Sequence, residues 1–119
     1  MGVAPVTTLL IALAGGLGSA ARFVVDAVVT RRLGSRLPWG VVVVNLTGSF
    51  AIGVVVGSTS GLTQTVVATG FLGGYTTFST ASLDSARLAL RGRGGAAVAH
   101  AAGTACACVL AAAAGIAVA

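Results

Sequence analysis

The sequence lacks most of the charge that a soluble protein of its length would carry. It contains no lysine and no glutamate, and 8% of its 119 residues are charged whereas 56% are hydrophobic. In soluble domains about a quarter of all residues are charged, so the composition indicates a membrane protein. A helical span takes about 20 residues. We therefore expect an all-α membrane protein with four transmembrane helices in a single domain, residues 1–119.

Catalytic and metal-binding residues are equally scarce. The acidic residues are Asp26 and Asp84, and the only histidine is His100. Cys106 and Cys108 lie two residues apart in the last apolar segment, so on a helix their side chains point away from one another. These positions offer no Ser/His/Asp set, no carboxylate pair and no ligand cluster. We therefore do not expect an enzyme, a disulfide or a metal–thiolate site.

Arginines are unevenly distributed among the loops that separate four apolar segments. The expected spans are residues 5–28, 39–57, 66–86 and 96–118. Six of the seven arginines follow the first or the third span, at Arg31, Arg32, Arg36, Arg87, Arg91 and Arg93. Since basic loops stay in the cytoplasm, we expect a multi-pass protein of the cell membrane with both termini outside. Arginines placed between lipid-embedded spans do not indicate a nucleic-acid partner.

The third span contains the most polar stretch of the chain, GFLGGYTTFSTASLD (residues 70–84). Each glycine weakens a helix by roughly 1 kcal/mol relative to alanine, and non-helical backbone at membrane depth is tolerated only where it lines a cavity or is buried in protein. A break near Gly73–Thr76 would free carbonyls for a hard cation such as Na⁺ and N–H groups for an anion. The alternative is that these residues only tighten helix packing. The hydroxyls that would replace lost water are those of Thr76, Thr77, Ser79 and Thr80.

Polar and aromatic residues within the spans each have two interpretations. Arg22 needs an aqueous cavity or a partner, so it either attracts anions at a vestibule or is neutralised by Asp26 four residues later. Asn45 is either a donor in an ion pathway or a helix–helix hydrogen bond worth about 1 kcal/mol. Phe78 either packs or presents the positive edge of its ring to an anion. His100 is either a pore-lining donor or an interfacial residue.

Two spans carry residues at a four-residue spacing that places them on one helix face. The second span has Val41, Asn45, Ser49, Gly53 and Gly57 in this register, and the fourth span has His100, Thr104, Cys108 and Ala112. The pair Gly53 and Gly57 allows a neighbouring helix to approach closely. Both spans are therefore predicted to present a small, partly polar face to a neighbour.

Three motifs, taken together, resemble those of the Fluc/CrcB fluoride channel family. GGLGSAARF (residues 15–23) is similar to the family's first-span G-A-x-x-R-Y, and VNLTGSF (residues 44–50) is similar to its V-N-x-x-G-S-F. The stretch at residues 70–84 is similar to G-F-x-G-G-x-T-T-F-S-T-F-S, the most specific of the three. The motifs occur in order in the expected spans, so the resemblance covers essentially the whole chain.

The resemblance implies an antiparallel dimer of four-helix subunits, with the third helix broken near its middle and two pores at the dimer interface. Such a channel passes fluoride, rejects chloride and exports cytoplasmic fluoride passively, which lowers its toxicity. The motif matches make Arg22 the vestibule arginine, Asn45 the pore asparagine and Phe78 a fluoride-facing ring. Ser79, Thr80, His100 and Thr104 are assigned to the same anion pathway. The carbonyls of Gly73 and Thr76 would hold a structural Na⁺ at the dimer interface.

The chain departs from the family pattern at three positions. The second phenylalanine is Ala81 here, the threonine before the pore asparagine is Val41, and Cys108 replaces a small residue of the fourth span. An inverted homodimer also needs a chain that inserts both ways, whereas these loops are strongly biased. We therefore hypothesise a heterodimer in which a related chain of opposite orientation supplies the missing ring. The alternative is a homodimer with a simplified pore.

Two further functions remain open at the level of sequence. Ala81 and Val41 are compatible with a non-conducting partner subunit that only completes another chain. A small multidrug-type transporter is also an antiparallel dimer of four short spans. The activity of such a transporter resembles proton exchange at a glutamate in the first span, and this chain has no glutamate.

Overall fold

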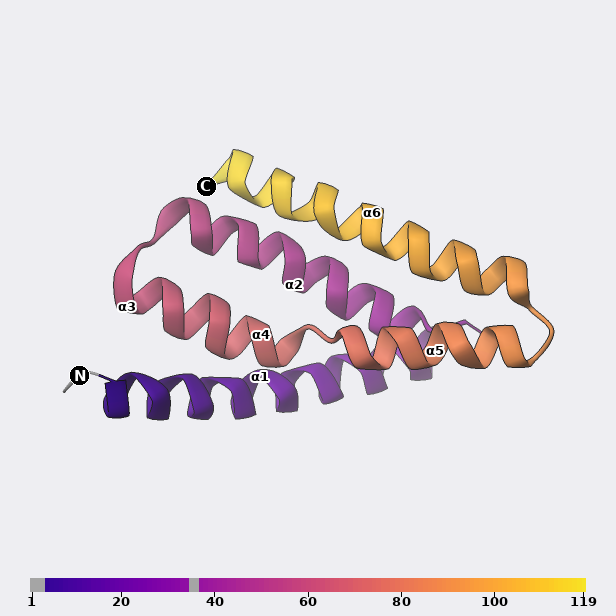
Figure 1. Cartoon of the computed structure of the whole chain (residues 1–119), viewed down its shortest axis with the longest axis horizontal. Helices are drawn as coiled ribbons and strands as arrows, with labels where there is room; N and C mark the ends of the chain where they lie inside the picture. The colour runs from indigo at the N-terminus through magenta and orange to yellow at the C-terminus, as the bar shows by residue number, and fades with distance from the viewer. Residues whose placement is uncertain (1–3, 35–36) are drawn as a thin grey trace.

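The computed structural model describes the backbone of residues 4–34 and 37–119 and, outside residues 78–82, their side chains. Its elements are α1 (Ala4–Leu33), α2 (Trp39–Ser58), α3 (Gly61–Gln64), η1 (Thr65–Leu72), α4 (Gly73–Tyr75), α5 (Phe78–Leu90) and α6 (Gly94–Val118). Figure 1 shows these helices lying roughly along one long axis. No β-strand occurs in this part of the chain, so the protein is all-helical, as predicted.

Three of these helices are long and apolar enough to cross a membrane. They are α1 with 30 residues, α2 with 20 and α6 with 25. α1 extends five residues beyond the expected span because no glycine or proline interrupts residues 29–33, and it ends at Gly34, whose φ is +83°. α2 follows Pro38, and α6 follows a turn in which Gly92 has φ +76°.

The predicted third span is divided into shorter pieces. After the single turn of α3, η1 winds as a π-helix, α4 adds one turn, and the helix stops at Thr76. Thr76 adopts an extended conformation (φ −78°, ψ 157°). α5 then begins at Phe78 and continues to Leu90, four residues past the expected end at residue 86. The interruption at Thr76–Thr77 thus lies at the end of the expected Gly73–Thr76 break.

Helices α2 and α6 run side by side in the same direction (Figure 1). Their backbones approach closely, because a Cβ atom at Gly53 would collide with the carbonyl of Ala112 and one at Gly115 would collide with the carbonyl of Phe50. Gly57 lies against Ala119 near the end of the same contact. The predicted role of Gly53 and Gly57 as a close-approach pair is therefore confirmed, and the partner helix is α6.

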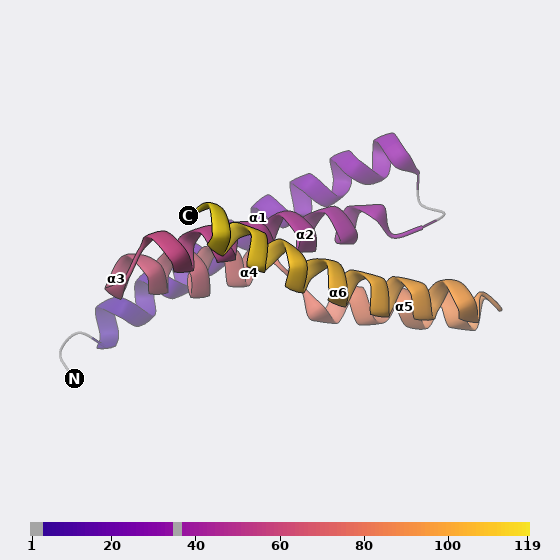
Figure 2. The ribbon, with the colours of Figure 1, turned by 90° about the horizontal axis from the view of Figure 1, so that it is seen from above.

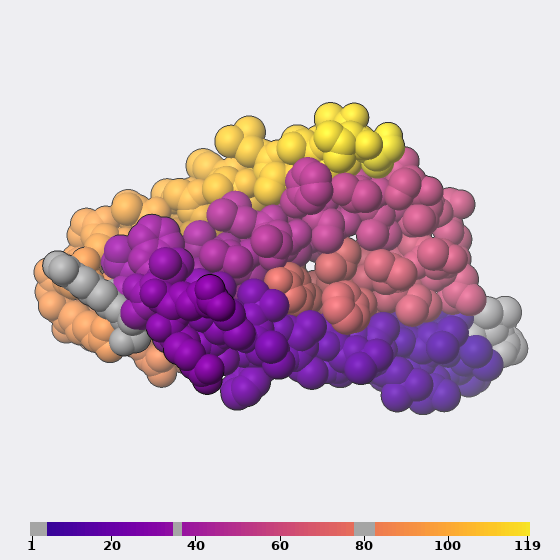
Figure 3. Space-filling model, turned by 180° about the vertical axis from the view of Figure 1, so that it is seen from behind, coloured from indigo at the N-terminus to yellow at the C-terminus, as the bar shows by residue number. Residues whose placement is uncertain are grey.

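Helix α1 lies along the opposite side of the molecule against η1 and α4 (Figure 3). The backbones again touch, since Gly18 meets the carbonyl of Phe71 and Gly74 meets the carbonyl of Gly15. Large apolar side chains of α1 point outward, with Leu17 66% and Phe23 74% exposed. Such an apolar exterior suits contact with lipid rather than water.

Four of the described arginines lie at one end of the molecule. The last turn of α1 carries Arg31 and Arg32, and the turn between α5 and α6 carries Arg91 and Arg93. Both lie at the end opposite the chain termini (Figure 1). Seen from above, the end of α1 and the α5–α6 hairpin diverge there (Figure 2). The charge bias of the sequence thus becomes an asymmetry between the two ends of the structure.

Candidate functional site: a broken helix beside a polar groove

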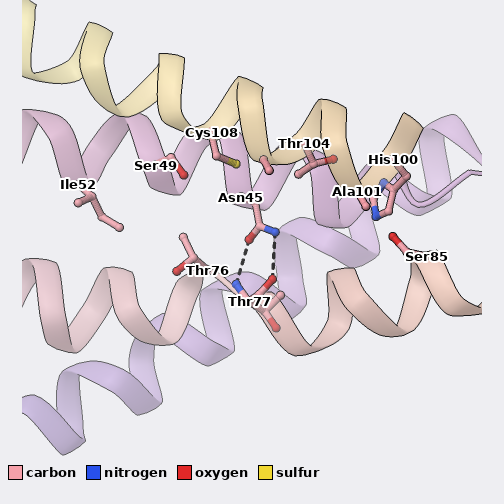
Figure 4. Close-up of a pocket in the computed structure, with 11 residues that line it drawn as sticks. Asn45, Ser49, Ile52, Thr76, Thr77, Ser85, His100, Ala101, Thr104 and Cys108 are labelled. Atoms are coloured by element: carbon pink, nitrogen blue, oxygen red, sulfur yellow. Dashed lines mark hydrogen bonds between the residues drawn. The ribbon is translucent and has the colours of Figure 1, made fainter. Parts of the chain in front are cut away.

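The break is held by a two-way hydrogen-bonded clamp from α2. Asn45 Nδ2 donates to the carbonyl of Thr77 at 3.0 Å, and the Thr77 backbone N–H donates to Asn45 Oδ1 at 2.9 Å (Figure 4). Asn45 is 8% exposed, and a buried backbone group without a partner costs about 1–3 kcal/mol. The amide therefore satisfies the backbone at the point where the helical pattern stops, and one of its two N–H groups is used for this.

Helix α1 supplies donors to the same break from the other side. The carbonyl of Gly74 accepts a hydrogen bond from Ser19 Oγ at 3.3 Å and one from Arg22 Nε at 3.5 Å. Carbonyls in the last turn of a helix have no intrahelical partner, so α1 satisfies one that the break releases. Both donors are close enough because Gly18 and Gly74 let the two backbones touch.

Arg22 does not pair with Asp26 within the described structure. No N···O distance of 4.0 Å or less joins them, and the ion pair that is present links Arg87 to Asp84 at 3.9 Å. The carboxylate of Asp26 lies against Gly40 and accepts a hydrogen bond from Thr30 Oγ1 at 3.3 Å. Of the two interpretations of Arg22, neutralisation by an ion pair with Asp26 is therefore not supported, and the side chain is directed to the break.

Two carbonyls of the break leave the helical pattern. In a continuous helix the Gly73 carbonyl would accept from the Thr77 N–H, which here donates to Asn45. The extended backbone of Thr76 turns its carbonyl out of the helix direction. Carbonyl oxygens at unwound helix segments are the ligands that Na⁺ takes in membrane proteins. The donor type at Gly73 and Thr76 therefore fits the expected cation, with Arg22 bonded to the intervening carbonyl of Gly74.

A groove with a cavity of about 550 Å³ runs between α2, the break, α5 and α6 (Figure 4). We call it the polar groove because seven of its eleven lining residues are polar. Its polar lining residues are Asn45, Ser49, Thr76, Thr77, Ser85, His100 and Thr104. The remaining lining residues are Ile52, Ala101, Ala105 and Cys108. No acidic side chain is among these described lining residues. The groove therefore offers hydrogen-bond donors without a fixed negative charge, an arrangement that favours an anion over a cation.

The structure brings together part of the predicted site. Asn45, Thr76, His100 and Thr104 all line the polar groove, although they come from three separate segments of the chain. His100 Nε2 is buried and has no hydrogen-bond partner among the described residues. The side chains of Phe78, Ser79, Thr80 and Ala81 lie outside the described part of the structure.

Two predicted residues lie beside the groove rather than in it. Arg22 lines a separate small hollow with Asp26 and Val41. Val41 is 5% exposed and faces α1, although its spacing places it in the same stripe as Asn45. The residues at four-residue spacing in the second span therefore do not all face the same neighbour. Val41 faces α1, whereas Asn45 and Ser49 line the groove. Val41 therefore belongs to the surroundings of Arg22 rather than to the groove.

Ser85 is a groove residue that sequence reasoning missed. Its side chain lies across the groove from His100 (Figure 4). Ser85 follows Phe78 by seven residues, a spacing that in sequence alone predicts one face of a helix. That spacing was the available signal. The spacing did not single out Ser85, because the preceding stretch has hydroxyl residues that would lie on every face of a helix.

The fold and the groove define a class of protein: an integral membrane protein whose apolar helices border a polar groove. A more particular identity comes from the family model described as CrcB-like protein, Camphor Resistance (CrcB), which matches residues 9–116. The chain belongs to the CrcB family. The resemblance inferred from the three motifs is thereby confirmed.

Several relatives carry an explicit functional name. The chain is 44% identical over 90 residues to fluoride-specific ion channel FluC 1 of Leifsonia xyli, covering 71% of this chain and 66% of that protein. It is 42% identical over 89 residues to FluC 2 of Cutibacterium acnes, covering 70% and 72%. It is 43% identical over 98 residues to FluC of Rhodospirillum centenum, covering 77% and 78%.

Proposed function

We propose that this chain forms a fluoride-selective passive channel that exports cytoplasmic fluoride. The observation that carries the proposal is the polar groove, which lines a membrane-embedded surface with amide, hydroxyl and imidazole groups and no carboxylate among its described residues. Channel selectivity depends on groups that replace an ion's hydration shell. The names of the relatives support fluoride as that ion. The family assignment leaves the multidrug-type transporter without support.

The pathway needs a second subunit to be complete. The groove is open on one side, and polar groups that line it, such as the hydroxyls of Ser49 and Thr104, are unfavourable against lipid. A partner of inverted orientation would close it, with segment 61–90 as the fourth, broken membrane crossing of each subunit. The carbonyls of Gly73 and Thr76 would then face those of the partner and hold a structural Na⁺ that fixes the interface.

Each polar group has a defined task in this proposal. Arg22, bonded to the break from α1, gives a positive potential that draws anions toward it. The second N–H of Asn45 and the hydroxyls of Ser49 and Thr104 replace water around the ion. Phe78, Ser79 and Thr80 would contribute at the start of α5, the phenylalanine through its positive ring edge. The fluoride anion is trapped in the less acidic cytoplasm, so its concentration gradient points outward. Flow down this gradient needs no energy source.

The dimer is a heterodimer in this proposal. Arg31, Arg32, Arg91 and Arg93 lie at one end of the described chain, so insertion in the opposite orientation would place that end outside the cytoplasm. A related chain with the opposite charge bias would supply the ring absent at Ala81. If accessibility labelling of single cysteines finds this chain in both orientations in equal amounts, the heterodimer is refuted.

A second candidate is a non-conducting partner subunit. The observation that favours it is the apolar contact of Val41 with the hollow that contains Arg22 and Asp26, since a threonine there would add a polar group beside the arginine. In this case the subunit would orient and stabilise a conducting chain. Introducing Ala81→Phe together with Val41→Thr separates the two ideas: a gained fluoride conductance argues for a degenerate pore.

The deciding experiment is fluoride efflux from liposomes that contain this chain alone, measured with a fluoride electrode and a chloride control. Fluoride release without chloride release supports the channel and shows that a homodimer is sufficient, which refutes the heterodimer. Release of both ions refutes selectivity. No release from folded protein, followed by release when a related chain is added, supports the heterodimer. No release with any partner refutes the conducting role.

A further inference from the structure

A second groove lies beside the first one, at the arginine-rich end. It has a volume of about 360 Å³ and runs between the start of α2 and the first half of α6. We call it the α2–α6 slot, and its lining residues are Leu37, Pro38, Trp39, Val42, Arg93, Ala96, Ala99, His100, Gly103, Thr104 and Ala107. Apart from Arg93, His100 and Thr104, these residues are apolar or lack a side chain. Alanine and glycine add little side-chain bulk along α6, which leaves room for a hydrocarbon chain.

Two residues of the slot, Arg93 and Trp39, lie where a membrane surface is expected. Arg93 precedes the first residue of α6, and Trp39 is the first residue of α2. Arginine and tryptophan both favour the boundary between lipid and water. Trp39 is 43% exposed, so its ring is available to a ligand in the slot. No acidic residue is among the described residues that line it, and Arg31, Arg32 and Arg91 lie at the same end of the molecule.

We propose that the α2–α6 slot binds an anionic phospholipid, with an acyl chain along Ala96, Ala99 and Gly103 and the phosphate at Arg93. The commitment to an anionic lipid rests on charge complementarity at one end and a mostly apolar lining along the rest. Basic pockets between transmembrane helices on the cytoplasmic side take such headgroups, and each arginine contributes about 1 kcal/mol near an anionic surface. The slot adjoins the ion pathway, because His100 and Thr104 line both grooves.

The test is native mass spectrometry of the purified full chain after exposure to equal amounts of dioleoyl phosphatidylglycerol and dioleoyl phosphatidylcholine. We expect wild-type protein to retain phosphatidylglycerol preferentially. Arg93→Gln should lower that preference about fivefold, and Arg93→Lys should preserve it. The matched control is Arg91→Gln, which removes the same charge two residues away from a side chain that does not line the slot.

The apolar part of the site has its own pair of variants. Ala99→Trp fills the slot and should lower retention of both lipids, whereas Ala102→Trp places the same ring on another exposed face of α6 and should not. Equal loss with Arg91→Gln and Arg93→Gln, or no effect of Ala99→Trp, would overturn the proposal. A change in the dimer fraction without a change in lipid retention would show a subunit contact instead, and also overturns it. Fluoride flux is not measured, so the outcome is independent of the proposed channel function.

Discussion

The two sides of the helix break are built in different ways. On the α1 side, backbones touch at Gly18 and Gly74, and donors from Ser19 and Arg22 satisfy the Gly74 carbonyl. On the α6 side, the break faces a groove of about 550 Å³ in which His100 Nε2 has no partner among the described residues. The first side is closed by contacts within the chain. The second side is open in a single subunit.

The difference between the closed and the open side separates the residues that fix the conformation of the break from those proposed to act in conduction. The closed side fixes the conformation of the break, because close packing leaves no room for another arrangement. In the proposed channel, the open side would keep polar groups available for an ion and for a partner subunit. Asn45 belongs to both, since it clamps Thr77 and also lines the groove. Variants on the closed side should therefore reduce stability, whereas variants on the open side should reduce conduction.

The largest effect is expected at Gly18 on the closed side. Gly18→Ala places a methyl group against the Phe71 carbonyl and the Tyr75 backbone nitrogen, and should lower the free energy of unfolding by about 3 kcal/mol. Gly16→Ala meets nothing within 4 Å and should be neutral or stabilising by up to about 1 kcal/mol. Unfolding in mixed detergent micelles, followed by fluorescence of the single tryptophan, measures both. Equal effects of the two substitutions would refute the tight contact.

A smaller effect is expected at Asn45, where the two sides meet. Asn45→Ala removes both hydrogen bonds that the amide makes to the Thr77 backbone, which should cost about 2 kcal/mol and lower fluoride efflux about tenfold. Thr47→Val is the control, because it removes an exposed hydrogen bond to Tyr75 Oη of 2.9 Å from the same helix. Thr47→Val should leave efflux unchanged. Full efflux from Asn45→Ala would show that conduction does not need the clamp.

The smallest effect on stability is expected at Thr104 on the open side. Thr104→Val keeps the shape of the side chain and removes one groove donor, so fluoride efflux should fall about fivefold while unfolding changes by less than about 0.5 kcal/mol. Thr65→Val is matched to it, since that hydroxyl donates to the Gly61 carbonyl at 3.1 Å and does not line the groove. If Thr104→Val lowers stability without changing efflux, the open side serves stability rather than conduction, and the assignment is wrong.

The break could be predicted because a glycine pair followed by a run of hydroxyls weakens a continuous helix at membrane depth. Its clamp could not, because Asn45 and Thr77 are 32 residues apart and nothing in either local pattern specifies the other. The two interpretations of Asn45 turned out to be compatible: its amide makes a structural hydrogen bond and lines the polar groove. The neighbours of Val41 could not be predicted for a related reason, since a four-residue spacing gives a helix face but not the element that covers it.

The sequence by itself determined the membrane class, the long apolar helices, the clustering of arginines and membership in the CrcB family. These properties depend on composition and short motifs, which local chemistry controls. Only the tertiary structure decided that Arg22 contacts Gly74 rather than Asp26, that Ser85 faces His100, and that an apolar slot adjoins the polar groove. These properties depend on which helix faces touch, and glycine contacts between distant segments set those distances.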